Sequence, residues 1–149
     1  MNYSIDLIRS DKENPAGFSR EEIADFLHSH LDQYGDRKES ILKCIAYAYG
    51  DGPGQDGFVL VVHEERRIIG TVIVNDTNMS GFIPEHILVY IAVHEGARGR
   101  GVGKALMQRT IDETDGSIAL HVEPDNPARH LYEKYGFSSK YIEMRLEKS

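Results

Sequence analysis

A glycine-rich segment that directly follows an apolar stretch is the feature that most constrains this fold. Residues 86–93, HILVYIAV, are nearly all apolar, which is typical of a central strand covered on both faces. Residues 95–104, EGARGRGVGK, then combine four glycines with three cations. Glycine permits positive φ angles and lets a ligand approach the backbone closely. Together these segments predict a strand, an anion-binding turn and a helix that begins within the turn.

The remaining segments alternate between strand and helix periodicities. Residues 50–57, GDGPGQDG, form the strongest break and indicate a loop within one domain. The strand patterns lie at 3–10, 57–75 (with a polar turn at 64–67), 117–123 and 141–147. The helical patterns lie at 23–31, after a Ser-x-x-Glu capping box at 19–22, and at 41–49 and 126–137. The order β-α-α-β-β-β-α-β-α-β predicts the α/β (α+β) class, with a mixed sheet flanked by helices.

Length and composition narrow the class of protein. A chain of 149 residues fits a single domain, 1–149, that can bury its own core. No apolar run approaches the roughly 20 residues that span a bilayer, and the first residues lack the pattern of a signal peptide, so we expect no membrane association. Cys44 is the only cysteine, which indicates a reducing, cytoplasmic setting. The net charge of −7 argues against nucleic-acid binding.

Two common phosphate-binding loops do not fit the glycine segment. A P-loop requires Gly-x-x-x-x-Gly-Lys-Ser/Thr, but Arg98 stands where the first glycine belongs and Ala105 where the Ser/Thr belongs. A dinucleotide fingerprint requires Gly-x-Gly-x-x-Gly, but Lys104 takes the place of the third glycine. Any anion bound by this glycine segment is therefore bound by a turn of another type.

A different pattern does fit, and a second motif accompanies it. Residues 98–103, RGRGVG, match Arg/Gln-x-x-Gly-x-Gly/Ala between the apolar strand and the next helix. Residues 123–137, EPDNPARHLYEKYGF, follow the next predicted strand. The two motifs resemble the GNAT N-acetyltransferase superfamily, whose second motif runs from an Asn through Ala and Tyr to Gly-Phe. Ala128 stands one place earlier than in the usual spacing, and residues 1–57 match only in their predicted elements.

The resemblance implies a fold, a reaction and a set of contacts. The fold is a mixed, mostly antiparallel sheet between helices, splayed where acetyl-CoA binds. The reaction is transfer of the acetyl group of acetyl-CoA to an amine of a small molecule, peptide or protein. The strand would lend backbone groups of Ile91 and Val93 to the acetyl-pantetheine arm. The residues implied at the pyrophosphate are Arg98, Gly99, Arg100, Gly101, Val102, Gly103 and Lys104.

The second motif supplies further candidates. The resemblance implies that Asn126 bonds the pantetheine arm, although its place before Pro127 equally suits a helix N-cap. Tyr132 is the candidate for chemistry, because a phenol can assist the departing CoA thiolate, although it also belongs to an apolar helical stripe. Glu85 is the candidate general base; His86 and Glu123 are further options, and a base reached through water stays open. We expect no metal and no covalent nucleophile.

Two other functions remain open at this point. One is a catalytically silent GNAT-like module that binds acyl-CoA, and the other is a nucleotide-phosphate binding protein. The partners expected are acetyl-CoA and an amine acceptor whose identity the sequence does not specify. The oligomeric state is likewise open, with a homodimer among the states considered.

Overall fold

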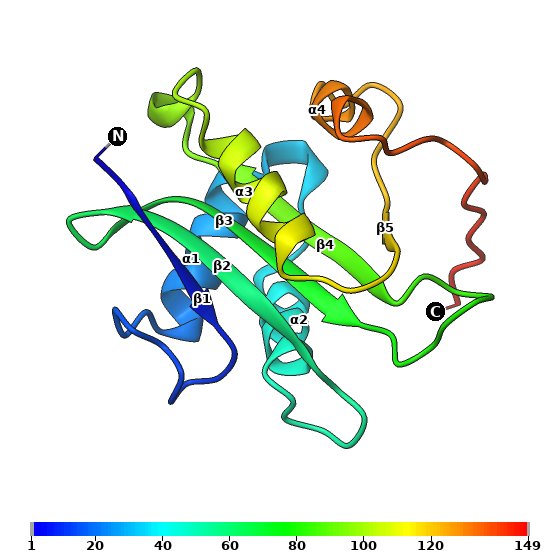
Figure 1. Ribbon diagram of the computed structural model, residues 1–149, viewed down its shortest axis with the longest axis horizontal. Helices are drawn as coiled ribbons and strands as arrows, with labels where there is room; N and C mark the ends of the chain where they lie inside the picture. Colours follow the sequence, from blue (N-terminus) through cyan, green and yellow to red (C-terminus); the bar gives the residue numbers. More distant parts are fainter. Residues whose placement is uncertain (1, 149) are drawn as a thin grey trace.

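A five-stranded sheet with the spatial order β1-β2-β3-β4-β5 organises the computed structural model, which describes residues 2–148 (Figure 1). The strands are β1 (Ser4–Ile8), β2 (Gly57–Glu64), β3 (Arg67–Asp76), β4 (His86–Val93) and β5 (Ile118–Leu120). Neighbouring strands are antiparallel except β4 and β5, which run parallel. The prediction of a mixed, mostly antiparallel sheet is therefore confirmed.

Helices cover both faces of this sheet. The helices are α1 (Arg20–His30), α2 (Lys38–Ala48), α3 (Val102–Asp112) and α4 (Arg129–Lys134), with short 3₁₀ turns η1 (Asp32–Tyr34) and η2 (Glu95–Ala97). Figure 1 shows α3 in front of the sheet and α1 and α2 behind it. Across residues 2–148, no helix has the length and apolar character needed to cross a membrane.

The start of α1 has the capping box that the sequence predicts. The Ser19 hydroxyl accepts the backbone N–H of Glu22 at 3.0 Å, and the Glu22 carboxylate accepts the backbone N–H of Ser19 at 3.0 Å. These bonds occupy N–H groups that have no acceptor within the helix. The helix then buries Ile23, Phe26 and Leu27 against the sheet.

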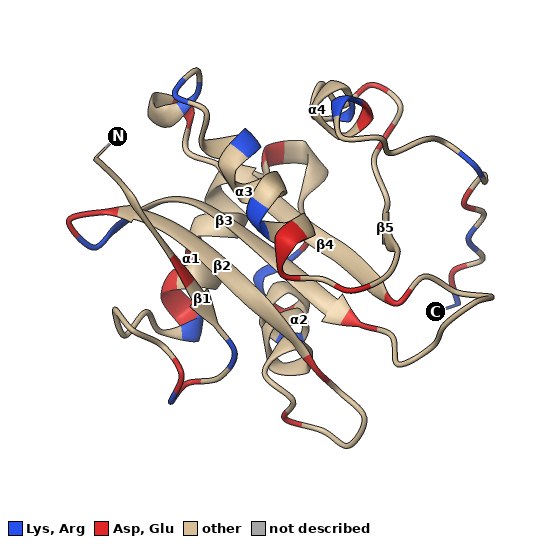
Figure 2. Ribbon diagram, viewed as in Figure 1, with Lys and Arg blue, Asp and Glu red and all other residues tan. Residues whose placement is uncertain are grey.

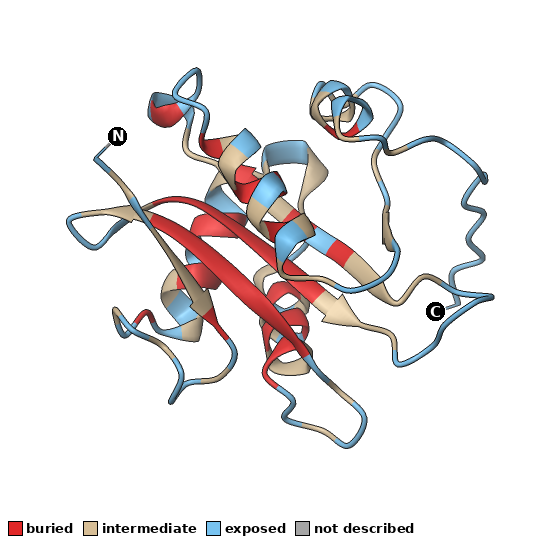
Figure 3. Cartoon of the chain, in the orientation of Figure 1, coloured by how far each residue is buried: buried red, intermediate tan, exposed pale blue. Residues whose placement is uncertain are grey.

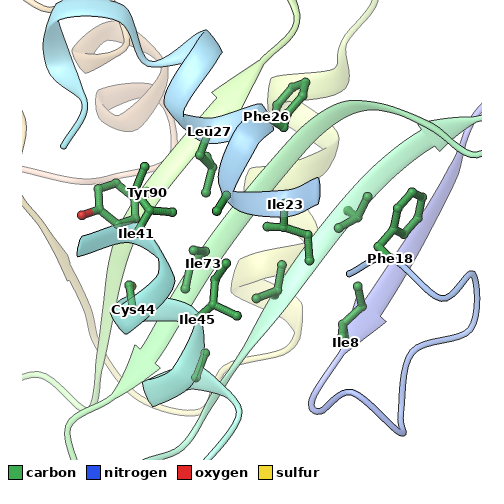
Figure 4. Close-up of a cluster of buried hydrophobic side chains, with 14 of the residues drawn as sticks. Ile8, Phe18, Ile23, Phe26, Leu27, Ile41, Cys44, Ile45, Ile73 and Tyr90 are labelled. Atoms are coloured by element: carbon green, nitrogen blue, oxygen red, sulfur yellow. The ribbon is translucent and has the colours of Figure 1, made fainter. Parts of the chain in front are cut away.

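Two separate groups of apolar side chains fill the space between the sheet and the helices. The cluster behind the sheet joins α1 and α2 to alternate residues of β2 and β3, including Val59, Val61 and Ile73 (Figure 4). The cluster in front joins α3 to the intervening residues, including Leu60 and Val72. Residues of a strand point alternately to its two faces, so β2 and β3 are buried on both sides (Figure 3).

A bulge in β4 changes the face to which its side chains point. Leu88 belongs to the front cluster, whereas Tyr90, two residues later, belongs to the rear cluster. Residues two apart share a face in a regular strand, so an extra residue must intervene. The pairing register with β3 shifts there, and Val89 is 37% exposed. The expectation that 86–93 is covered on both faces is therefore wrong at the bulge.

Near the C-terminus the structure differs from the sequence prediction. The predicted strand at 117–123 is reduced to the three residues of β5, and the predicted helix at 126–137 to the six residues of α4. The predicted strand at 141–147 is absent, because residues 138–148 make no ladder with another strand. A strand requires a partner for its backbone groups, and within residues 2–148 this segment pairs with no strand.

The capping box generates a first prediction. Ser19→Ala removes the side-chain acceptor for the Glu22 N–H, so we expect the free energy of unfolding to fall by about 1 kcal/mol. Ser29→Ala, at an exposed position of the same helix, is the matched control and should change stability by less than about 0.5 kcal/mol. Urea denaturation measures both. Equal effects of the two substitutions would contradict the capping role.

Candidate functional site

The site begins where β4 and β5 separate. Their pairing runs only from His86 opposite Ile118 to Leu88 opposite Leu120. Beyond Leu88, the remaining half of β4 still pairs with β3 but has no strand on its other side. Figure 1 shows β5 diverging from β4 toward α4. A stretch of sheet backbone is thus left open between two strands rather than at an outer edge.

The open backbone groups belong to the residues that the sequence predicts. The backbone N–H of His94 donates to the carbonyl of Ile69 at 2.8 Å, so His94 faces β3. Successive residues of an antiparallel strand direct their N–H and C=O groups alternately to the two sides. Val93 and Ile91 therefore direct their backbone groups into the gap, where a ligand can hydrogen-bond to them.

The glycine turn follows directly and leads into α3. Gly99 and Gly101 adopt φ angles of +83° and +78°, a left-handed conformation that favours glycine. The first helical hydrogen bond runs from the Ala105 N–H to the Gly101 carbonyl at 2.9 Å, so the N–H groups of residues 102–104 have no acceptor within the helix. Free N–H groups at a helix N-terminus, together with the helix dipole, form a site for an anion.

The three cations of the turn are not equivalent. Arg100 forms a bidentate ion pair with Glu64 at the end of β2, with N–O distances of 3.0 and 2.7 Å. This guanidinium lowers the pKa of Glu64, and its own charge is largely balanced. Arg98 and Lys104 are exposed and make no ion pair within residues 2–148. Figure 2 shows basic residues along the turn and the start of α3.

The two sequence motifs meet at this point. The Tyr135 hydroxyl at the end of α4 donates to the Lys104 carbonyl in the first turn of α3 at 3.1 Å. A Cβ added at Gly103 would lie 3.5 Å from the Leu131 side chain and 3.8 Å from that of Val93. The start of α3, α4 and the end of β4 therefore surround one region.

Asn126 and Tyr132 both belong to the second sequence motif, in the segment that runs from β5 to the end of α4. The Asn126 side-chain oxygen accepts the Ala128 N–H at 2.9 Å in the turn before α4. The N-cap residue of α4 is Ala128, so Asn126 does not cap this helix. Its amide nitrogen makes no hydrogen bond to residues 2–148 and is available to a ligand. Tyr132 is 7% exposed and packs against Phe137. Burial, with a smaller effect of the Glu123 charge, raises the pKa of Tyr132 to about 12, so its phenol is neutral.

Glu85 lies away from this group. It precedes β4, at the opposite end of the strand from the glycine turn, and its carboxylate accepts the Ser117 N–H at 2.8 Å. That bond lowers the pKa of Glu85. A carboxylate with a lowered pKa is a weaker base, so the contact suits closure of the 116–118 turn better than proton transfer.

Sequence reasoning missed a polar contact on the rear face of β4. The Tyr90 hydroxyl donates to the Asp36 carboxylate in the segment between η1 and α2. The Tyr34 hydroxyl, in η1, donates to the Asp125 carbonyl between β5 and α4 at 3.5 Å. The α1–α2 connection therefore contacts β4 and the loop between β5 and α4. Nothing in the sequence pairs Asp36 with Tyr90, which are 54 positions apart.

Two histidines also meet beside the turn. The rings of His30 and His94 lie 4.6 Å apart, and the His94 Nδ1 accepts the Gly96 N–H at 2.9 Å. Burial and the neighbouring His94 lower the pKa of His30.

Residues 2–148 contain no cluster of three or more His, Cys, Asp or Glu side chains placed to hold a metal ion. The arrangement therefore offers amide donors, a neutral phenol and an anion site.

Comparison with known proteins identifies related domains. A family model described as an acetyltransferase (GNAT) domain matches residues 55–139, which include the gap, the glycine turn and α4. Comparison with curated protein sequences gave no match.

Solved structures with the same fold include several acetyltransferases. A putative acetyl transferase from Pyrococcus furiosus is 22% identical with a TM-score of 0.64, covering 98% of this chain and 99% of that one. A ribosomal-protein-alanine N-acetyltransferase from Brucella melitensis biovar Abortus 2308 is 19% identical with a TM-score of 0.64, with coverage of 98% and 99%. An aminoglycoside N-acetyltransferase in complex with CoA is 14% identical with a TM-score of 0.68, with coverage of 98% and 94%.

Proposed function

The chain belongs to the GNAT acetyltransferase family, and on that premise we propose that it transfers the acetyl group of acetyl-CoA directly to an amine of an acceptor that carries a further positive charge. Family membership makes it an acyltransferase and favours this reaction over the silent module and the nucleotide-binding protein. The observation that carries the proposal is the gap between β4 and β5, whose open backbone leads directly to the anion site of the glycine turn.

Acetyl-CoA has chemical groups that match both parts of the site. The amides of its pantetheine arm can hydrogen-bond to the gap-facing backbone of Ile91 and Val93, as an added strand would. Its pyrophosphate suits the free N–H groups of residues 102–104, with Arg98 and Lys104 supplying charge. Arg100 contributes less, because Glu64 already balances it. The free amide nitrogen of Asn126 is a further donor for the arm.

The transfer step requires a nucleophile, an oxyanion site and a leaving group. A neutral amine attacks the thioester carbon, and backbone N–H groups in the gap stabilise the oxyanion of the tetrahedral intermediate. The attack itself forms the C–N bond. Collapse of the intermediate restores the carbonyl and breaks the C–S bond, with the electron pair passing to sulfur and the extra proton of the nitrogen passing to a base or to water. The Tyr132 phenol, which its raised pKa keeps protonated, donates to the departing thiolate.

Direct transfer is favoured over a covalent acetyl-enzyme. Cys44 is the one thiol in the sequence, and it is buried in the rear cluster. Burial raises the pKa of Cys44 to about 12, so it stays a thiol rather than the reactive thiolate. Glu85 is disfavoured as the base, because it precedes β4 and its carboxylate is bonded to the Ser117 N–H.

The acceptor site is proposed on the rear side of the gap, beneath the α1–α2 connection. Asp36 is exposed there and accepts the hydrogen bond of Tyr90, which lies in the half of β4 that has no β5 neighbour. A carboxylate beside the acetyl group would bind an ammonium group of the acceptor. The net charge of −7 also favours association with a cation. These features support an amine that carries a second positive charge.

A panel of amines tests the reaction. Pairs of primary amines matched in size, one of each pair with an additional ammonium group, should release CoA faster from the cationic member. Thiol release from acetyl-CoA is the measurement. Absence of release with every amine would contradict the proposed transfer, and equal rates within pairs would contradict the cationic acceptor.

The glycine turn generates a prediction about cofactor binding. A β-branched side chain is strained at φ +78°, so Gly101→Val should shift the start of α3 and abolish CoA binding in calorimetry. Gly54→Val is the matched control, because Gly54 has a φ of +73° and, like Gly101, nothing within 4 Å of an added Cβ. Unchanged CoA affinity in Gly101→Val would show that the turn does not bind the pyrophosphate.

Asp36→Asn tests recognition of the acceptor. The amide retains a hydrogen-bond acceptor for Tyr90 but loses the charge, so kcat/KM for the dicationic amines should fall about tenfold or more, on the scale of a bond to a charged group. The monocationic amines should be less affected. Asp112→Asn removes the same charge at the end of α3 and should leave both groups of amines unchanged. Parallel losses in the two variants would contradict a specific role for Asp36.

Tyr132→Phe tests the leaving-group role. The substitution preserves most of the packing against Phe137 but removes the hydroxyl, so kcat should fall roughly 10²–10⁴-fold with little change in KM for acetyl-CoA. Because the phenol pKa is raised to about 12, wild-type kcat should show no alkaline loss from this group below about pH 10. Thermal melting checks the fold. Equal kcat in the two proteins would remove Tyr132 from the mechanism.

A further inference from the structure

His94 lies at the junction between β4 and the glycine turn. Its backbone N–H donates to the Ile69 carbonyl of β3 at 2.8 Å, which fixes the residue to the sheet. Its backbone carbonyl accepts the Ala97 N–H at 2.9 Å, and its ring Nδ1 accepts the Gly96 N–H at 2.9 Å. One group of His94 thus holds the sheet and two groups hold η2. Because Arg98 follows η2 directly, the start of the turn depends on these bonds.

The bond to Gly96 defines the protonation state of the His94 ring. A backbone N–H can only donate, so Nδ1 must present its lone pair and the ring hydrogen must be on Nε2. A Cβ added at Gly96 would lie 3.3 Å from this Nδ1, so the ring lies directly against the glycine. A second ring proton would occupy Nδ1 and remove the acceptor. The bond therefore exists only while His94 is neutral.

The ring of His30 supports His94 from the rear side. His30 is the last residue of α1, and its ring centre lies 4.6 Å from that of His94. On its other side His30 lies 4.4 Å from the ring of Phe26, which is buried in the rear cluster. Neutral rings can pack in this way, whereas two imidazolium ions at this separation repel each other. The packing of α1 against the junction therefore also favours the neutral state.

Charged groups of both signs surround the pair. Burial is the main cause of the lowered pKa of His30, followed by the charge of His94; Arg98 acts in the same direction, whereas Asp32 and Glu95 oppose it. The open side of His30 faces a hollow between α1 and the β2–β3 hairpin. The ionisable side chains that line this hollow with His30 are Glu22, Asp25, Arg66 and Arg67. Two carboxylates and two guanidinium groups largely balance, so burial decides the direction.

The direction of the effect with pH follows from the lowered pKa of His30. The unfolded chain binds this proton more readily than the folded protein, so stability rises with pH where the two differ. The contribution is complete above the ordinary histidine value of about 6.5, and it is lost as the pH falls from there toward the lower value of the folded state. Acid therefore opposes the packing of the two rings and, at His94, also removes the acceptor for Gly96.

We propose that His94 is a positioning residue of the glycine turn and holds it in its anion-binding shape only while the ring is neutral. This role rests on the proposed binding of CoA at the turn. In the neutral state the bond to Gly96 fixes the segment that leads into Arg98 and the free N–H groups of residues 102–104. When the ring takes a proton from the solvent, that bond is lost and the affinity for CoA falls. A simple charge effect has the opposite sign, because an imidazolium ion attracts a pyrophosphate.

Calorimetry with CoA at about pH 7.5 and about pH 5.5, on either side of the ordinary histidine value, tests this role. In His94→Asn the side-chain oxygen can accept the N–H two residues later, as in an Asx turn, and it does not titrate. This variant should bind CoA within about threefold of wild type at the higher pH, whereas His94→Ala should bind about tenfold more weakly, because the Gly96 N–H loses its acceptor.

The acid response is the decisive comparison. From the higher to the lower pH, wild type should lose about tenfold more affinity than His94→Asn, on the scale of one lost hydrogen bond. The phosphates of CoA titrate equally in both experiments, so the difference between the proteins isolates His94. His28→Asn, at an exposed position of α1, is the matched control and should retain the acid loss of wild type. Equal pH dependence in wild type and His94→Asn, or tighter wild-type binding in acid, would overturn the proposal.

Nuclear magnetic resonance of the protein without CoA tests the bond independently of the proposed function. In wild type the Gly96 amide signal should shift with the same midpoint as the His94 ring, and in His94→Asn it should stay constant over this range. Circular dichroism at both pH values checks the fold. Absence of CoA binding at every pH would contradict the proposed function and, with it, the effect on affinity. A Gly96 signal that does not follow the His94 titration would overturn the positioning role alone.

Discussion

The separation of β4 from β5 determines how the rest of the site is arranged. Backbone N–H and C=O groups inside a protein require partners, and the far half of β4 has none on the side from which β5 has departed. The bulge near Val89 directly follows Leu88, the last residue of β4 that pairs with β5. The same bulge turns Tyr90 to the rear face. The gap is held at one end by three residue pairs of parallel sheet and spanned at the other by the Tyr135–Lys104 contact. A ligand with amide groups can complete the hydrogen bonding that the protein leaves open.

Much of this arrangement could be predicted from local sequence. The Ser19 capping box, the hairpin between β2 and β3 and the start of α3 depend on residues close together in the chain, and all three are present. The glycine turn belongs to this group, since the left-handed φ angles of Gly99 and Gly101 are what glycine in such a turn predicts. The direction of the Ile91 and Val93 backbone follows from strand alternation once the partner strand is known. Family resemblance supplied the remaining link, from an anion site to a particular cofactor.

The features that could not be predicted depend on contacts between distant segments. Local sequence marks Arg100 as one of three equivalent cations, and only the fold brings Glu64 beside it. The Asp36–Tyr90 contact joins a connection to a strand, and neither residue has a local signal for it. The pattern at 141–147 is that of a strand, but a pattern cannot supply the neighbour that a strand needs. The buried side chains of β2 and β3 likewise show that an apolar run identifies a central strand only when helices cover both of its faces.

The two hydrophobic clusters on opposite faces of the sheet share no side chain. The front cluster supports α3, the glycine turn and Tyr132, whereas the rear cluster supports α1, α2 and the connection that carries Asp36. Side-chain replacements on one face are therefore separated from the other by the backbone of β2 and β3. In evolutionary terms the molecule is modular within one sheet: side chains of the rear layer can be exchanged while the front layer keeps the geometry of the glycine turn and α3.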